Sequence, residues 1–262
     1  MNKQIELNQK IALTRKGSKA QHTVLQSLFW HILPGGLTTL AFFLLRPFTA
    51  GLGYPPLLAF LLAILLVDLP VMVGIMVYIA HRENGRFSFS SVIVFQEKVT
   101  WPRFLLGFVV AFTAVYLLII LLTPLNNLLA ETVFSGLPAW LLLEDPSQYE
   151  AFPRNVLLVV FGLQLILTGI VLPWIEELYF RGFLLPRLSH SAMTAPLLGG
   201  LFFALYHVWQ PQGFLTVFLL GVALSVVAWR TRDIRLPVAL HIFANLLPRL
   251  AILLTAFALP VS

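Results

Sequence analysis

Long apolar runs alternate with short polar segments along most of the chain. Each run is close to the ~20 residues that a helix needs to cross the ~30 Å hydrocarbon core of a bilayer. The runs cover residues 27–46, 55–80, 104–123, 155–173, 194–209, 213–229 and 237–259. This pattern predicts an all-α fold, a polytopic transmembrane bundle of seven to eight membrane helices.

The helix count is open between residues 154 and 190. This stretch is too long for one upright crossing at about 1.5 Å per residue. Pro173 offers a place for a kink or a break in the helix. An eighth helix or a re-entrant segment would therefore fit here.

Charge along the chain predicts its orientation. Residues 1–25 form a basic tail with Glu6 as the only acid, and basic loops then alternate with loops poor in lysine and arginine. By the positive-inside rule this alternation predicts a cytoplasmic N-terminus. We expect residues 26–262 to form a single transmembrane domain, in the plasma (inner) membrane if the source is bacterial.

Composition agrees with lipid as the main solvent. Hydrophobic residues make up 59% of the chain and charged residues 11%, whereas a soluble domain carries about 25% charged residues. The net charge of +6 lies beside the apolar runs, where it indicates topology and contacts with anionic lipids rather than nucleic-acid binding. The absence of cysteine excludes disulfides, thiol catalysis and cysteine metal ligands.

Few strongly polar side chains fall within the runs or at their ends. A charged group at the centre of a span costs about 2.5–3.5 kcal/mol, so each needs a partner, a water-filled cavity or a function. The set is Arg46, Asp68, Glu176, Glu177, Arg181, His207, His241, Asn245 and Arg249. We expect Asp68, which lies two residues before Pro70, to pair with Arg46 or with a backbone carbonyl freed by the proline.

Two adjacent acids, Glu176 and Glu177, are separated by about 100° around a helix, so they serve different contacts. Glu177 and Arg181 have the four-residue spacing and acid-first order that favour an ion pair. Glu176 is left without a partner on its own helix. Desolvation makes such a carboxylate more basic, which favours a general base. The alternative is that both acids solvate a helix end in a cytoplasmic loop.

The histidines have helical partners. Phe203 and His207 share one helix face, and His241 and Asn245 share another, because each pair is separated by four residues. A lone histidine in an apolar helix more often bonds a neighbouring carbonyl than acts on a substrate. Since lipid-facing placement would be costly for all these groups, we expect them to converge with Glu176 inside the bundle. Their depths, measured from the nearest basic residues, differ by about half a bilayer, so the depth of the site is open.

Three motifs, in this order, resemble those of the intramembrane glutamate endopeptidases of the CAAX-protease and bacteriocin-processing (Abi) family. They are Glu-Glu-x-x-x-Arg, Phe-x-x-x-His and His-x-x-x-Asn, at residues 176–181, 203–207 and 241–245. The resemblance covers residues 155–250 and implies that they form the catalytic core of an intramembrane protease.

The resemblance also implies a mechanism without a metal or another cofactor. Glu176 would be the general base that deprotonates the attacking water, and His207 and His241 would hold that water. Asn245 would bind the water or the oxyanion. Supporting residues would be Glu177, Arg181 and Phe203. Zinc is the rival, because two histidines and a glutamate are a common zinc set, but the chain contains no His-Glu-x-x-His.

Two other classes of function stay open. A non-catalytic immunity or scaffold protein would need only the fold. A proton-coupled transporter would use Asp68, Glu176 and the histidines as a relay, and it would predict inverted repeats or paired broken helices, which we do not find in the sequence. For the protease we expect a peptide or protein substrate at the membrane. The sequence indicates neither the identity of the substrate, nor whether it is lipidated, nor the oligomeric state.

Overall fold

The computed structural model describes residues 21–143, 146–188 and 194–258. Within these ranges, six helices are long and apolar enough to cross a membrane. They are Val24–Gly51, Pro56–Asn84, Trp101–Glu131, Arg154–Arg187, Pro211–Thr231 and Arg235–Phe257. The predicted all-α, polytopic architecture is confirmed, and the protein is an integral membrane protein.

Changes in the helical turn divide these spans into shorter elements. The α-helices are α2 (Val24–Gly51), α3 (Pro56–Ala63), α4 (Leu69–Asn84), α5 (Trp101–Glu131), α6 (Arg154–Ile166), α7 (Leu172–Glu176), α8 (Thr194–Tyr206), α9 (Phe214–Thr231) and α10 (Arg235–Ala258). The π-helical segments are Ile64–Asp68, Leu167–Val171 and Glu177–Leu184. Short 3₁₀ turns lie at Phe89–Val92, Ala139–Leu141, Pro146–Tyr149, Leu185–Arg187 and Pro211–Gly213.

Two of the π segments directly precede a proline. Ile64–Asp68 ends two residues before Pro70, and Leu167–Val171 ends two residues before Pro173. Proline lacks the N–H that would bond four residues back, and its ring crowds that carbonyl. The wider π turn relieves this conflict. The stretch in which Pro173 offered a place for a kink or a break therefore forms one continuous span, Arg154–Arg187, and contains no additional crossing.

The apolar run at 194–209 is not a full crossing. It forms α8, a helix of 13 residues, which is about 20 Å long and shorter than the ~30 Å hydrocarbon core. Helix α8 packs against α2 and α9, and eight of its residues are buried. The prediction of seven crossings is corrected, within the described residues, to six long helices and this short inner one.

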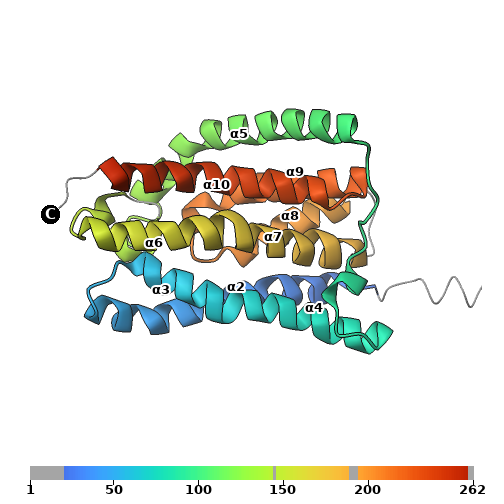
Figure 1. The fold of residues 1–262 in the computed structure, drawn as a ribbon, viewed down its shortest axis with the longest axis horizontal. Coiled ribbons are helices and arrows are strands. Elements are labelled where there is room, and N and C mark those ends of the chain that lie inside the picture. Colours follow the sequence, from blue (N-terminus) through green and yellow to red (C-terminus); the bar gives the residue numbers. More distant parts are fainter. Residues whose placement is uncertain (1–20, 144–145, 189–193, 259–262) are drawn as a thin grey trace, which may run out of the picture.

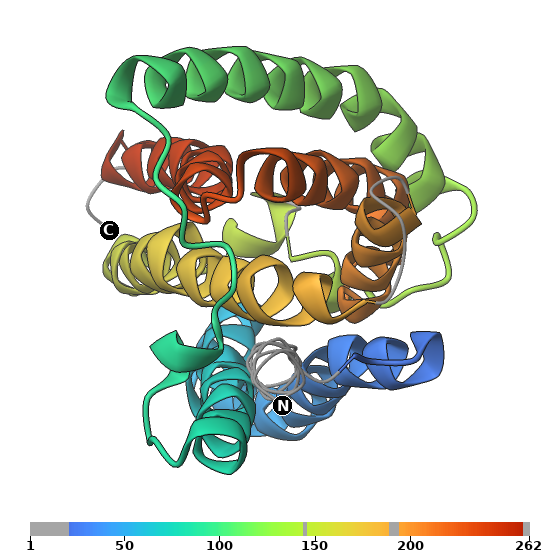
Figure 2. The same cartoon turned by 90° about the vertical axis from the view of Figure 1, so that its right-hand side faces the viewer.

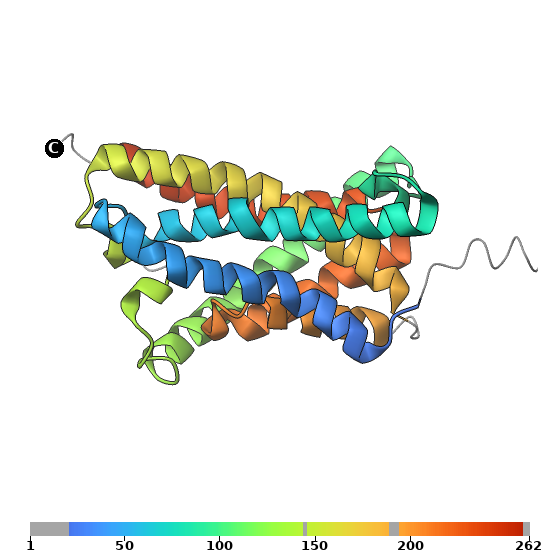
Figure 3. The same cartoon turned by 90° about the horizontal axis from the view of Figure 1, so that it is seen from below.

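The helices lie side by side along the long axis of the molecule, with α2–α4 on one side and α5 on the other (Figure 1). Helix α10 lies between them and contacts α6, α9 and α5. Figure 2 shows α5 as an outer cover over α9 and α10. Only Val115 of α5 is buried, and the side of this helix that faces away from α9 and α10 is left to lipid. On the opposite side, α2 packs against α3 and against the π segment Ile64–Asp68 that leads into α4 (Figure 3).

One end of the bundle is built from basic segments that are far apart in the sequence. The N–H of Glu97 donates to the carbonyl of Arg232 at 2.9 Å, and Arg187 contacts Glu83 at 3.0 Å. The connections that carry these residues meet at the same end of the bundle in Figure 1. This arrangement agrees with the predicted alternation of basic and non-basic loops. Residues 1–20 of the predicted tail lie outside the described residues.

Helices α8 and α9 approach closely through glycine. A Cβ atom on Gly200 would lie 2.6 Å from the backbone nitrogen of Val222, and one on Gly221 would lie 3.0 Å from Cα of Gly200. Small residues at helix interfaces let backbones approach inside a membrane. The contact also places the Gly221 carbonyl 3.2 Å from Nη2 of Arg181, which connects α9 to the motif-bearing helix.

Candidate active site

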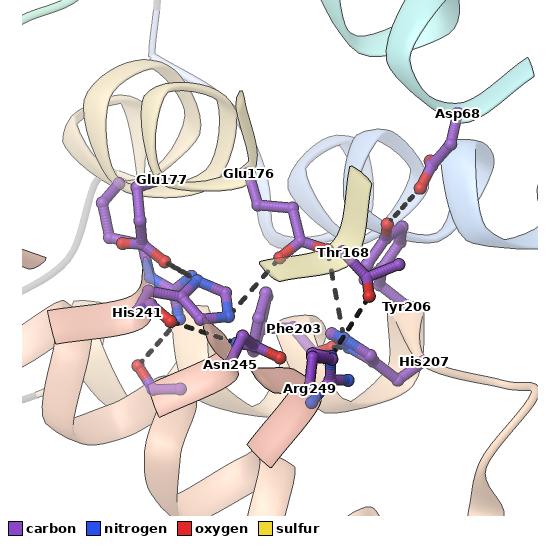
Figure 4. A network of polar contacts seen from close by, with 12 residues as sticks. Asp68, Thr168, Glu176, Glu177, Phe203, Tyr206, His207, His241, Asn245 and Arg249 are labelled. Atoms are coloured by element: carbon purple, nitrogen blue, oxygen red, sulfur yellow. Dashed lines mark hydrogen bonds and ion pairs between the residues drawn. The ribbon is translucent and has the colours of Figure 1, made fainter. Parts of the chain in front are cut away.

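Glu176 is the last residue of α7, and its side chain points into the bundle beside the two histidines (Figure 4). It is only 2% exposed. Its Oε2 lies 3.6 Å from Nε2 of His241, and its Oε1 lies 4.0 Å from Nε2 of His207. The structure therefore brings together these three residues from separate helices. The difference in depth expected from the sequence assumed that all helices begin at the same level in the membrane. Because Glu176, His207 and His241 lie close together, that assumption is wrong.

The His207 ring is oriented by the helix that precedes it. Its Nδ1 lies 2.8 Å from the carbonyl oxygen of Phe203. Because a carbonyl only accepts, Nδ1 is the donor in this contact. In the neutral ring Nε2 is then an acceptor, and it faces the carboxylate of Glu176, which also accepts when ionised. Two acceptors 4.0 Å apart are suited to a bridging donor such as water.

Glu177 has a different set of partners. Its Oε1 lies 2.7 Å from Nη1 of Arg181 and 2.7 Å from Nδ1 of His241. The predicted ion pair is therefore present, and it is buried. The guanidinium of Arg181 lies 4.1 Å from the centre of the Phe203 ring. The arginine of the first motif thus contacts the phenylalanine of the second, and the acid contacts the histidine of the third.

Two further side chains of α10 face the same region. Asn245 donates from Nδ2 to the carbonyl of His241 at 3.1 Å, and its side chain lines the cavity beside Glu176. One turn further on, Nε of Arg249 donates to Oγ1 of Thr168 at 3.1 Å. Arg249 also lines the cavity, which adds a cation to the set that the three motifs contain.

A small polar cavity lies between these groups. Its volume is about 80 Å³, and a water molecule occupies about 30 Å³ in the liquid. Its polar lining includes Thr168, Glu176, His207, His241, Asn245 and Arg249. The cavity has room for a reacting water among hydrogen-bonding groups.

A larger apolar cavity adjoins the polar one. It has a volume of about 630 Å³ and includes Tyr149, Phe161 and Ile252 in its lining. Leu143 and Gln164 line both cavities. The volume is within the range of about 300–1,000 Å³ that is usual for ligand sites. The arrangement suits a substrate that has an apolar group close to its reacting bond.

A protein site for a metal ion such as zinc needs at least three ligand side chains that point to one position. Among the described residues, no group of three or more histidine, cysteine, aspartate or glutamate side chains is arranged to hold a metal ion. The Nδ1 atoms of His207 and His241 are both engaged by protein oxygens, and their Nε2 atoms face Glu176.

Asp68 has a partner that the sequence analysis missed. Its Oδ2 accepts a hydrogen bond of 2.5 Å from the hydroxyl of Tyr206. The predicted pairing with Arg46 is wrong, because that guanidinium lies over the Trp140 ring, 4.4 Å from its centre. A buried tyrosine hydroxyl needs a partner, so the sequence could have indicated that Tyr206, directly before His207, contacts a polar group. Only the folded chain shows which acid it reaches.

Comparison with protein-family models gives a match over residues 157–247, to the model described as "Type II CAAX prenyl endopeptidase Rce1-like". The matched range contains all three motifs and ends before Arg249. Asp68 lies outside it. Comparisons with curated proteins and with solved structures found no match.

Proposed function

We propose that this chain, whose residues 157–247 match the model of Rce1-like type II CAAX prenyl endopeptidases, is an intramembrane endopeptidase in which Glu176 activates the attacking water. The match to the family model supports the protease function. The glutamate mechanism rests on one observation: a buried carboxylate faces the Nε2 atoms of His207 and His241 across gaps of 4.0 and 3.6 Å.

The proposed reaction begins with a water that donates one hydrogen bond to Glu176 and one to Nε2 of His207. Glu176 takes a proton as the water oxygen attacks the scissile carbonyl. The His241 ring borders the water site on its other side and keeps the water in place by contact rather than by a third hydrogen bond, and Asn245 donates to the water or to the developing oxyanion. When the tetrahedral intermediate collapses, Glu176 returns the proton to the leaving amine. The peptide bond is thereby hydrolysed and Glu176 is regenerated.

A peptide with a lipidated C-terminal region is the substrate class that we propose. The name of the matched family refers to a prenyl substrate. The apolar cavity of about 630 Å³ beside the polar one would take the lipid while the peptide bond enters the polar cavity. A lipid already in the bilayer gains little hydrophobic free energy on entering an apolar cavity, so the cavity would serve mainly to position the lipid and, with it, the peptide bond.

Orientation follows from the basic end of the bundle. We infer that this end faces the cytoplasm and anionic lipid headgroups, with the N-terminus on the same side. In a bacterial source the membrane would be the plasma membrane.

The test uses wild-type protein and the Glu176→Gln variant, each reconstituted in lipid vesicles. The substrates are a peptide with a farnesylated cysteine followed by three residues, and the same peptide without farnesyl. Mass spectrometry measures release of the C-terminal fragment. We expect the wild type to cleave the farnesylated peptide and Glu176→Gln to retain less than about one hundredth of its kcat.

Each proposal has a result that contradicts it. Cleavage of both peptides at the same kcat/KM would exclude lipid recognition but leave the protease. Equal cleavage by Glu176→Gln would exclude the glutamate mechanism. A folded wild type that releases no fragment from either peptide, or from membrane proteins of its own source, would favour a non-catalytic member of the family.

A further inference from the structure

Asp68 is a fully buried acid that the proposed reaction does not use. It lies 0% exposed at the end of a π-helical segment between α3 and α4, far in the sequence from the three motifs. One carboxylate oxygen, Oδ2, accepts the hydrogen bond from Tyr206. The other, Oδ1, is buried and makes no hydrogen bond of ordinary geometry among the described residues, although the Thr38 side chain lies beside the carboxyl group. An acid at such a position is costly unless it has a purpose.

Tyr206 connects this acid to the candidate active site. It is the last residue of α8 and is 0% exposed. Its ring packs against Phe180 and Trp209, with centroids 5.0 and 5.1 Å apart, so the hydroxyl is held in place. The same hydroxyl lies beside the carboxyl group of Glu176, and Figure 4 shows Tyr206 between Asp68 and the Glu176 region.

The Tyr206 hydroxyl has only one hydrogen, and this limits which hydrogen bonds it can form with Asp68 and Glu176. Tyrosine has one O–H to donate and oxygen lone pairs that accept. Because the hydrogen of Tyr206 is directed to Asp68, its oxygen is left as an acceptor toward Glu176. An ionised Glu176 has no proton to offer. A protonated Glu176 has one, so the hydrogen bond forms only after Glu176 has taken a proton.

We propose that Asp68 is a positioning residue that holds the Tyr206 hydroxyl so that its oxygen accepts a hydrogen bond from Glu176 once Glu176 has taken the proton of the attacking water. This inference rests on the proposed role of Glu176. The proton stays on Glu176 and then passes to the leaving amine, so no proton moves along the arm formed by Asp68 and Tyr206. An interaction that forms during the reaction and is absent from the ground state raises kcat rather than lowering KM.

A purely structural role would behave differently. A hydrogen bond that only joins α4 to α8 would contribute to the stability of the bundle and leave turnover per folded molecule unchanged. The split between kcat and stability therefore distinguishes the two roles.

The test compares Tyr206→Phe, Asp68→Asn and the double variant in the vesicle assay. Asparagine keeps the shape of Asp68, but its amide can donate to the tyrosine oxygen and occupy the acceptor that Glu176 needs. We expect each single variant to lower kcat about tenfold, which corresponds to about 1.4 kcal/mol and is the size of effect usual for one lost hydrogen bond between neutral groups. KM should stay within about twofold, and the double variant should lose no more than Tyr206→Phe alone.

Tyr179→Phe is the matched control. Tyr179 is equally buried at 0% exposed, and its hydroxyl donates to the Trp30 carbonyl at 2.8 Å, away from Glu176. We expect this variant to retain wild-type kcat. The inference is overturned if the effects of Asp68→Asn and Tyr206→Phe are additive, if kcat is unchanged while thermal stability falls, or if Tyr179→Phe loses as much activity.

A second measurement does not require a substrate. At a pH low enough to protonate Glu176, its carboxyl C=O stretch is identified in the infrared spectrum by its loss in Glu176→Gln. Loss of the hydrogen bond to tyrosine should shift this band in Tyr206→Phe and in Asp68→Asn but not in Tyr179→Phe. An unshifted band in Tyr206→Phe and Asp68→Asn would contradict the proposed hydrogen bond between Glu176 and Tyr206. A shifted band in a protein that cleaves nothing would contradict only the protease function.

Discussion

Nδ1 of His241 lies 2.7 Å from Oε1 of Glu177. The same oxygen contacts Arg181 at 2.7 Å, so one carboxylate joins the motif-bearing helix to α10. A carboxylate accepts, and Nδ1 is therefore the donor. Glu177 thus orients the histidine ring and directs Nε2 toward Glu176. Spacing along a helix predicted the contact with Arg181 but gave no indication of this second contact.

Glu177→Gln should reduce both stability and turnover. It leaves the buried Arg181 without an acid, and loss of one partner from a buried pair costs about 3–5 kcal/mol. A neutral amide also no longer fixes the tautomer of His241, so kcat should fall in the fraction that remains folded. Thermal unfolding in detergent and kcat in vesicles measure the two effects. Glu83→Gln is the control, because it removes the acid of the Arg187 pair outside the cavity. A fully stable but inactive Glu177→Gln would indicate that the roles of Glu176 and Glu177 are exchanged.

Chelation tests the proposed independence from metal. Wild-type protein is treated exhaustively with a chelator, dialysed and assayed, with and without added zinc. We expect kcat to be unchanged in all samples, because the proposed general base is Glu176 itself. Loss of activity that added zinc restores would favour the zinc mechanism, in which His207, His241 and Glu176 would be ligands.

The sequence predicted local relationships better than long-range ones. The four-residue spacing of Glu177 and Arg181 determines an ion pair within one helix, because neighbours at that spacing always share a face. The free-energy cost of exposing polar groups to lipid predicted that Glu176 and the two histidines lie together inside the bundle. The contact between Asp68 and Tyr206 joins two residues that are 138 positions apart in the sequence. The spacing of residues along a helix does not show which helices become neighbours.

The helix count failed for a related reason. Apolar length measures how far a helix could extend in lipid, but it does not distinguish a full crossing from a short buried helix such as α8. The π segments before Pro70 and Pro173 were also missed, because a proline in the sequence predicts a break equally well. The neighbouring helices decide whether the chain breaks or widens its turn.

Asp233 should make stability depend on pH. It lies between the last two spans and is 1% exposed. Burial alone would raise its pKa, but hydrogen bonds from Arg235 and from the N–H of Val99 outweigh burial and hold the pKa below its ordinary value. A lowered pKa means that the ionised form stabilises the fold above the unfolded pKa, and that this stabilisation is lost as pH falls through the folded pKa.

The measurement compares thermal unfolding of wild type and Asp233→Asn from neutral to acidic pH. We expect the variant to be less stable at neutral pH and the difference to shrink below about pH 4, near the ordinary pKa of aspartate. Glu97→Gln, at an exposed acid in the same region, should show no such convergence. A constant difference between wild type and Asp233→Asn would contradict the assignment.

Gly35→Ala should damage the site from outside the segment that matches the family model. Gly35 lies on α2, where an added Cβ would be 2.1 Å from the backbone carbonyl oxygen of Tyr206. Backbone atoms cannot yield as a flexible side chain can, so α2 and the end of α8 must separate. That movement displaces Tyr206 and, with it, His207.

The adjacent Gly36 has nothing within 4 Å of an added Cβ, so Gly36→Ala is a control on the same helix. We expect Gly35→Ala to lower kcat at least tenfold and Gly36→Ala to retain wild-type kcat, since a misplacement of about 1 Å costs on the order of a hundredfold in rate. Equal activity of the two variants would mean that the close contact of α2 with α8 does not position the catalytic groups.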